Sequence, residues 1–334
     1  MNKILFGVGV SVCSAIAVLM SAKVVDASTD TKVVLITLDG VRHQEFFNGL
    51  DESIGSDYLP IPKDVLMPFV WKDLIQTRHA WVFGNREQGS ICKANNPETI
   101  SLPAYADILS GVHQSRVDGN RWNGQLEYPT ITDRMLVAGV PESGIGVISS
   151  WKNIERVLTQ SGGQPRFYAQ NGRFPWDRES PWWSGARLDA DTMKAVEKKI
   201  PDPSFNPQFL FISFDDTDEW AHKNKYANYL DAIHRGDSYI RRIFELVEAK
   251  PGYAGNTVYI ITTDHGRGEG KLWKSHWDVP GSEYIWAVVY APQVEQSPYA
   301  LLSNCHHASI GQWMYELVTH RSFNAELASR DTGY

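Results

Sequence analysis

The chain has 334 residues, of which 43% are hydrophobic and 21% charged, and its net charge is −7. This composition excludes a disordered chain and is sufficient for one large folded domain or two small ones. The acidic balance gives no reason to expect a nucleic acid polymer or an anionic membrane surface as the main partner.

The first 27 residues predict a secretory signal peptide. Lys3 precedes an apolar run at 4–20, and small residues follow up to Ala27. The run contains glycine and serine and is short for a membrane span, although a membrane anchor is the alternative interpretation. We therefore expect an exported protein, periplasmic or secreted, without a stable membrane anchor, in which 28–334 forms a single catalytic domain.

Hydrophobic patterning predicts alternating strands and helices. β-Branched runs that end in polar residues predict buried strands at 33–38, 144–148, 209–214, 257–261 and 284–290. Helical patterns lie between them, at 102–109, 190–199, 226–249 and 310–318. The alternation predicts an α/β fold with helices on both faces of a largely parallel sheet. The segment 160–188 is rich in Gly, Pro, Arg and Trp, has no clear period, and predicts an irregular insertion.

Three of the predicted strands end close to acidic residues. Asp39 follows the first strand, Asp215, Asp216 and Asp218 follow the third, and Asp264 with His265 follows the fourth. A single aspartate in such a place would be typical of a turn or a helix cap. Because ligands bind beyond the carboxyl ends of parallel strands, the set predicts one functional site.

The spacing of these residues indicates metal chemistry. Asp218 and His222 are four positions apart, and His276 follows the pair Asp264 and His265. Carboxylate oxygens and neutral imidazoles are suitable ligands for zinc. His276 alone would be typical of a structural histidine, but the set together predicts a metal site.

A candidate nucleophile lies at the start of a predicted helix. Ser101 precedes Pro103, which suits the first helical turn because its missing N–H costs nothing there. The amides of a helix N-terminus favour an anionic phosphoryl group. Ser101 is therefore both a candidate N-cap and a candidate nucleophile.

Taken in order, these motifs resemble the alkaline phosphatase superfamily, and most closely its nucleotide pyrophosphatase/phosphodiesterase-like branch. The motifs are VLITLDGVR at 34–42, SLPAY at 101–105, DEWAH at 218–222, and TDHG at 263–266 followed by His276. The resemblance covers roughly 33–290 and implies the alkaline phosphatase-like fold. It also implies a metal-dependent hydrolase of phosphoric esters, of phosphodiesterase or nucleotide pyrophosphatase type, acting on a small phosphorylated substrate.

Site roles are carried over position by position from the resemblance. One divalent ion would be held by Asp218, His222 and His276. A second would be held by Asp39, Asp264 and His265, with Ser101 as a further ligand. The histidines favour zinc, while manganese or a mixed pair stays open. Ser101 would form a phosphoseryl intermediate, and Asn123 would stabilise the phosphoryl oxygens, with Asn120 as the alternative.

Three departures from the family pattern bear on the substrate. Ala221 replaces the usual glycine without altering the ligand spacing, and Ser101 stands where many phosphodiesterases have threonine. Tyr105 replaces the arginine of the sulfatase motif, which argues against a sulfatase-like hydrolase. A phosphomonoesterase, a transferase that passes the group to another acceptor, and a non-catalytic metal-binding scaffold are the remaining alternatives.

Several other residues have two interpretations. Cys92 and Cys305 either pair in an oxidising compartment or are buried thiols. Arg267 either recognises a phosphate or, as we favour, belongs to a solvated loop, and Trp277 either stacks on a substrate ring or packs against the protein. His306 and its neighbour lack a carboxylate at suitable spacing and are left out of the metal site.

Overall fold

The computed structural model describes residues 31–158, 166–167, 186–293, 298 and 305–324. Seven strands form the main sheet: β1 (Lys32–Leu38), β2 (Trp81–Phe83), β4 (Ile145–Ser149), β5 (Arg166–Phe167), β6 (Phe209–Phe214), β7 (Thr257–Thr262) and β9 (Ala287–Tyr290). Their order is β2-β9-β7-β1-β6-β4-β5. β7, β1, β6, β4 and β5 are parallel, whereas β9 is antiparallel to both of its neighbours. The predicted α/β fold with a largely parallel sheet is confirmed.

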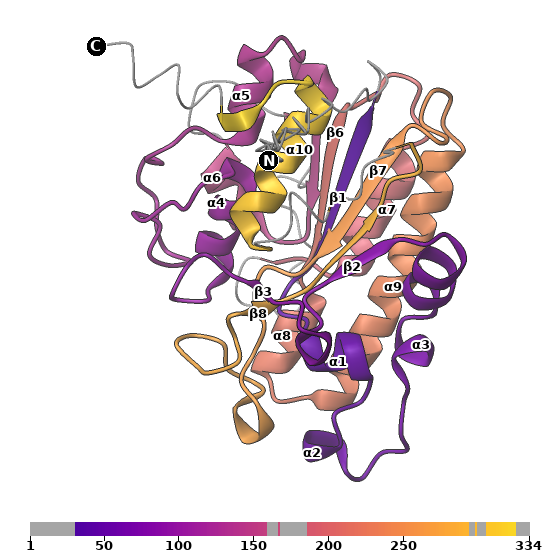
Figure 1. Cartoon of the computed structure of the whole chain (residues 1–334), viewed down its shortest axis with the longest axis vertical. Helices are drawn as coiled ribbons and strands as arrows, with labels where there is room; N and C mark the ends of the chain where they lie inside the picture. Colours follow the sequence, from indigo (N-terminus) through magenta and orange to yellow (C-terminus); the bar gives the residue numbers. More distant parts are fainter. Residues whose placement is uncertain (1–30, 159–165, 168–185, 294–297, 299–304, 325–334) are drawn as a thin grey trace, which may run out of the picture.

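Helices cover both faces of this sheet (Figure 1). The longer ones are α4 (Ser101–Ser110), α5 (Ile131–Val137), α7 (Asp189–Lys199), α8 (Asp216–His222), α9 (Tyr226–Glu248) and α10 (His307–Thr319). The shorter ones are α1 (His43–Asn48), α2 (Glu52–Gly55), α3 (Lys63–Leu66), α6 (Glu155–Leu158) and the π-helix η1 (Phe69–Thr77). Short 3-10 turns occur at Arg86–Gln88, Glu142–Gly144, Lys152–Ile154 and Gly270–Leu272. α4, α5, α6 and α10 pack over one face, and α7, α9 and η1 over the other.

The central strand shows why the sheet is covered on both sides. In β1, Val33 and Leu35 belong to the core under α4 and α10, while Val34 and Ile36 belong to the core under α9. All seven residues of β1 are buried. A strand buried on both faces is continuously apolar rather than alternating, as the sequence run predicted.

The predicted strand at 284–290 is divided into two. Tyr284–Ile285 forms β8, which pairs with β3 (Cys92–Lys93) in a separate two-stranded sheet, whereas β9 joins the main sheet. Trp286 lies between them, fully buried, and its Nε1 donates to the carbonyl of Val41 at 3.0 Å. The prediction of a single strand was wrong because the chain changes its strand partner at Trp286, whose side chain is buried in the core.

Two of the sequence predictions fall largely outside the described residues. The signal peptide at 1–27 lies outside them entirely, as does most of the insertion at 160–188, of which the short strand β5 is described. Among the residues that are described, no helix is both long and apolar enough to cross a membrane.

Candidate metal centre and active site

The three parallel strands β7, β1 and β6 are adjacent, so their carboxyl ends deliver the predicted acids to one edge of the sheet. Asp39 follows β1 directly, and Asp264 with His265 follows β7 after one residue. Asp218 lies in α8, which begins two residues after β6. The strand order therefore brings together residues that are more than 200 positions apart.

Asp39, Asp264 and His265 form the first donor group. One ligand atom from each lies within 4.8 Å of the others, and all three side chains are buried. One oxygen of each carboxylate is anchored: Tyr105 Oη donates to Asp39 Oδ2 at 3.1 Å, and Gly40 N–H donates to Asp264 Oδ1 at 2.9 Å. The other two oxygens, Asp39 Oδ1 and Asp264 Oδ2, are buried without a hydrogen bond.

His265 lies between the two donor groups. Its Nδ1 lies 2.9 Å from the Gly266 carbonyl, to which it donates, so Nε2 keeps its lone pair. That Nε2 lies 3.3 Å from Asp264 Oδ2, 3.6 Å from Asp39 Oδ1 and 3.4 Å from Ser101 Oγ. Burial lowers the pKa of His265, which keeps the imidazole neutral.

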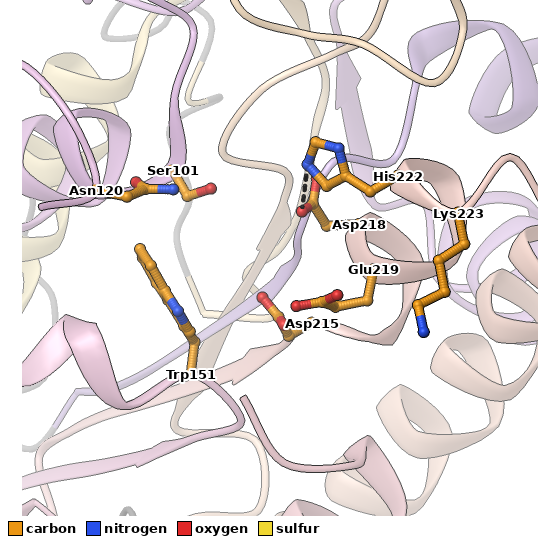
Figure 2. A pocket seen from close by; sticks show the side chains of 8 residues that line it. All are labelled: Ser101, Asn120, Trp151, Asp215, Asp218, Glu219, His222 and Lys223. Carbon is orange, nitrogen blue, oxygen red and sulfur yellow. Dashed lines mark ion pairs between the residues drawn. The ribbon is translucent and has the colours of Figure 1, made fainter. Parts of the chain in front are cut away.

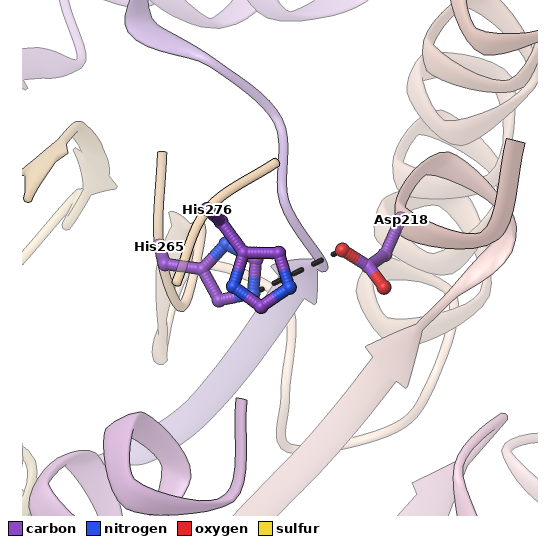
Figure 3. Close-up of side chains that lie close together, drawn as sticks. All are labelled: Asp218, His265 and His276. Carbon is purple, nitrogen blue, oxygen red and sulfur yellow. Dashed lines mark ion pairs between the residues drawn. The ribbon is translucent and has the colours of Figure 1, made fainter. Parts of the chain in front are cut away.

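Asp218 and His276 form a second donor group that shares His265, and His222, the third residue expected from the sequence, lies beside it. His222 Nε2 lies 3.1 Å from Asp218 Oδ2 and 3.1 Å from His276 Nε2. The ring of His276 stacks on that of His265, with centroids 3.9 Å apart, and Asp218 faces both rings (Figure 3). All six predicted Asp and His residues therefore lie in one continuous cluster.

A divalent cation fits this donor set. Burial, together with the neighbouring carboxylates Asp264 and Asp215, raises the pKa of Asp39 well above its ordinary value, which indicates that negative charge is concentrated around this carboxylate. Burial also lowers the pKa of His276 well below its ordinary value, and its Nε2 faces a second imidazole nitrogen, that of His222. Bare carboxylate oxygens and neutral imidazoles are the usual ligands of zinc and similar ions.

Arg267 is a correction to the sequence interpretation. We expected it on a solvated loop, but its side chain is fully buried and forms an ion pair with Asp218 Oδ1. Its Nη1 donates to the Lys274 carbonyl at 3.0 Å. The chain can turn inward here because Gly266 has no Cβ: an added one would lie 2.5 Å from the Tyr284 carbonyl oxygen. Burial lowers the pKa of Arg267 to about 9, so it stays charged at neutral pH.

The nucleophile helix begins one residue earlier than expected. Ile100 is the N-cap of α4, and Ser101 is its first helical residue, so Ser101 is not itself the cap. The helix starts beside the metal-ligand cluster, and Ser101 is buried with its Oγ facing His265. Asn120 Oδ1 accepts from Leu102 N–H at 2.9 Å, which occupies one amide of the first turn.

Of the two asparagines considered, Asn120 lies beside Ser101. Both line a cavity of about 440 Å³, with Asp218 and His222 across from them (Figure 2). Asn123 lines a neighbouring, more open cavity of about 940 Å³, next to Trp277. Asn120 is common to both cavities, whereas Ser101 lines only the smaller of these two.

The smaller cavity has further lining residues, of which Trp151 and Lys223 were not singled out from the sequence, whereas Asp215 was noted after the third predicted strand and Glu219 within the motif at 218–222. Trp151 forms one wall, and Asp215, Glu219 and Lys223 form the opposite, polar one (Figure 2). Burial and the neighbouring Glu219 raise the pKa of Asp215. Asp215 and Glu219 flank the recognisable Asp218 and so carry a detectable signal. Trp151, which follows β4 after one residue, has no such signal in the sequence.

Cys92 and Cys305 form a disulfide across 213 positions, which resolves the two interpretations in favour of pairing. It joins β3 to the chain just before α10. His306 caps α10, its Nδ1 accepting from Ser309 N–H at 3.1 Å. His307 is buried and lies 3.2 Å from the Thr263 carbonyl. Neither belongs to the two donor groups identified among the described residues.

Comparisons with known proteins agree with this fold. The model of the metalloenzyme superfamily matches residues 186–315, which include five of the six Asp and His donors. The zinc-bound C-terminal periplasmic domain of EptC from Escherichia coli is similar in structure, with 12% identity, 88% of this chain and 84% of that one covered, and a TM-score of 0.55. No curated protein sequence matches.

Two further solved structures are similar. A putative sulfatase from Bacteroides thetaiotaomicron has 14% identity and a TM-score of 0.59, with 89% of this chain and 72% of that one covered. A phosphonate monoester hydrolase from Silicibacter pomeroyi has 14% identity and a TM-score of 0.55, with 90% and 77% covered. At these identities the similarity shows the fold.

The fold and the site define an α/β metalloenzyme with aspartate and histidine donors at the carboxyl edge of its sheet. The model of the metalloenzyme superfamily matches the part of the chain at 186–315, and the similar solved structures share the alkaline phosphatase-like fold. Members of this superfamily are hydrolases or transferases that act on phosphate and sulfate esters. The match to this family model and the donor set together indicate a site for divalent metal.

Proposed function

We propose that this protein is an exported hydrolase of phosphate diesters that uses Ser101 as its nucleophile and two divalent ions, preferably zinc. The observation that carries the proposal is the position of Ser101 Oγ, 3.4 Å from His265 Nε2 at the junction of the two donor groups. A serine hydroxyl at that point is next to both groups of metal-binding atoms.

The residues that would hold the ions are those expected from the sequence. Asp39, Asp264 and His265, with Ser101, would hold one, and Asp218, His222 and His276 the other. When bound, the two ions would polarise the phosphoryl oxygens and make the serine hydroxyl more acidic.

The reaction on this chain has two displacements. Ser101 Oγ loses its proton to solvent and forms a bond to phosphorus while one ester oxygen departs and takes up a proton, which gives a phosphoseryl enzyme that keeps the second ester group. A water molecule then attacks phosphorus and loses a proton to solvent, the Oγ–P bond breaks, and Ser101 Oγ takes up a proton as the monoester product leaves. Trp151 shields one side of the cavity in which this takes place.

Asn120 is the better candidate for the amide that stabilises the phosphoryl oxygens. Its Oδ1 is held by Leu102 N–H, which leaves its Nδ2 group as a donor beside Ser101. A preoriented donor of this kind acts on charge that develops in the transition state. Asn123, at the neighbouring cavity, would contact another part of the substrate.

The polar wall of the cavity favours a diester over a monoester. Asp215 and Glu219 line it together with one cation, Lys223. A monoester is a dianion and benefits from positive charge around its outer oxygens, whereas a diester carries a single charge. The acidic wall therefore opposes the second charge of a monoester.

Export is part of the proposal. The apolar N-terminal sequence predicts a signal peptide, and the disulfide between Cys92 and Cys305 is typical of proteins in an oxidising compartment. Two of the similar solved structures are C-terminal periplasmic domains of EptC, one from Escherichia coli and one, a phosphoethanolamine transferase, from Campylobacter jejuni.

The test compares p-nitrophenyl phosphate, bis-p-nitrophenyl phosphate and p-nitrophenyl sulfate as substrates of the zinc-loaded protein, with and without a chelator. We expect chelator-sensitive turnover with preference for the diester. Ser101→Ala should bind the metal but lose turnover, while the exposed Ser115→Ala serves as the matched control. Full activity of Ser101→Ala would refute the nucleophile, and preference for the monoester would make the protein a phosphatase.

A further inference from the structure

Thr99, two residues before the nucleophile, has an unusual backbone conformation. Its φ is +50°, in the left-handed region, although its side chain is β-branched and 97% buried. The other non-glycine residues with positive φ in the described chain are His, Asn and Asp, of which Asn and Asp enter this region readily. A conformation of this kind costs about 1–3 kcal/mol and persists only where surrounding contacts enforce it.

Two of the contacts around Thr99 lead to His276, and others lead to Ser282 and the Glu98 carbonyl. The carbonyl of Thr99 accepts a hydrogen bond from His276 Nδ1 at 2.6 Å. In the opposite direction, Thr99 Oγ1 donates to the backbone carbonyl of His276 and lies 2.9 Å from Ser282 Oγ. Thr99 and His276 are therefore joined twice, although they are 177 positions apart.

The first of these bonds decides which nitrogen of His276 is available to a ligand. Because Nδ1 carries the proton that is donated to Thr99, Nε2 keeps its lone pair and faces His222 and Asp218. A hydrogen bond on the outer ring nitrogen fixes the tautomer and the orientation of a metal-binding imidazole. The left-handed backbone conformation of Thr99 orients its carbonyl toward His276.

The same turn also leads into α4. Ile100 adopts an extended conformation as N-cap, and Ser101 starts the helix. A change in the Thr99 backbone would therefore move the nucleophile and the orientation of His276 together.

We propose that Thr99 is a positioning residue that sets the orientation of His276 toward the metal and its spacing from Ser101. This inference rests on the proposed role of His276 as a metal ligand. The hydroxyl of Thr99 holds the strained turn in place, and the carbonyl of Thr99 holds the imidazole.

The test measures zinc affinity of the metal-free protein by competition with a chromophoric chelator. Thr99→Val keeps the shape and β-branching but loses the hydroxyl, and Thr99→Ser keeps the hydroxyl as the matched control. We expect Thr99→Val to bind one of two zinc equivalents about 10–100-fold more weakly, with Thr99→Ser close to the native protein. A purely structural role for Thr99 would lower the melting temperature without changing the affinity of one equivalent selectively.

A native protein that binds two equivalents, together with a Thr99→Val variant of equal affinity, would overturn the role of Thr99 and leave the proposed function standing. A native protein that binds no zinc would overturn both. If Thr99→Val does not fold, Thr99→Ala carries the test, because alanine is not β-branched, lacks the hydroxyl and still disfavours the positive φ. Its zinc affinity should fall in the same way, and native affinity would refute the proposal.

Discussion

Replacing Arg267 by methionine tests how the acidic site is held together before a metal binds. The guanidinium is fully buried against Asp218, and its charge is also close to Asp39 and Asp215. Removing one partner of a buried ion pair costs about 3–5 kcal/mol, because the remaining charge is left uncompensated. For a chain of this size each kcal/mol corresponds to roughly 2 °C, so the melting temperature of the metal-free protein should fall by roughly 6–10 °C.

The assay is thermal unfolding of the protein in chelator and again in excess zinc. Lys271→Met is the matched control, because it removes one positive charge from the same loop at an exposed position and should change stability by less than about 0.5 kcal/mol. Excess zinc should reduce the difference in melting temperature between Arg267→Met and the native protein, since the ions supply the missing positive charge. Equal melting of the two variants in chelator would refute this account of Arg267.

Three further results are expected. Asn120→Ala should lower kcat on the diester about 100-fold, as loss of an oxyanion donor does, while Asn123→Ala should leave kcat near native. A large loss of kcat in Asn123→Ala with little loss in Asn120→Ala would instead assign the oxyanion donor to Asn123. Burial raises the pKa of Asp237 to about 6 from 3.8, so its stabilising effect is complete below about pH 4 and is lost as the pH rises through 6. The stability of Asp237→Asn relative to the native protein, measured by urea unfolding, should therefore rise by up to about 3 kcal/mol between pH 4 and pH 7, and a constant difference would contradict this. Replacing Cys92 and Cys305 together by serine should cost about 2–5 kcal/mol, measured by the same method, and no loss would show that the long loop is already constrained in the unfolded chain.

The donors could be predicted from the sequence because each follows a recognisable strand. β1, β6 and β7 are apolar runs that end abruptly, and the parallel sheet brings their carboxyl ends together. Asp39, Asp218 and Asp264 therefore needed only the strand assignment to be placed at one edge. His276 is further from its strand and was singled out by its position after the pair Asp264 and His265.

The residues that hold the donors were harder to predict. Tyr105 was noted only as a departure from the sulfatase motif, yet its hydroxyl anchors Asp39. Thr99 precedes the nucleophile without any periodic pattern, and its contact with His276 spans 177 positions. Arg267 has the composition of a surface loop, and only the two glycines beside it, Gly266 and Gly268, indicated a close passage of the backbone. These contacts depend on loop conformation, which hydrophobic periodicity does not describe.

The charges of the proposed site connect these anchoring residues to the substrate. The three ligand carboxylates and Arg267 together carry two negative charges, since the imidazoles are neutral. Two divalent ions would reverse this to two positive charges, and an ionised Ser101 would leave one. A diester anion then brings the site to neutrality, whereas a monoester dianion leaves a surplus negative charge beside Asp215 and Glu219. Arg267 thus acts on substrate choice from outside the ligand set: without its charge the metal-loaded site would be neutral, and even the diester would leave it with one surplus negative charge.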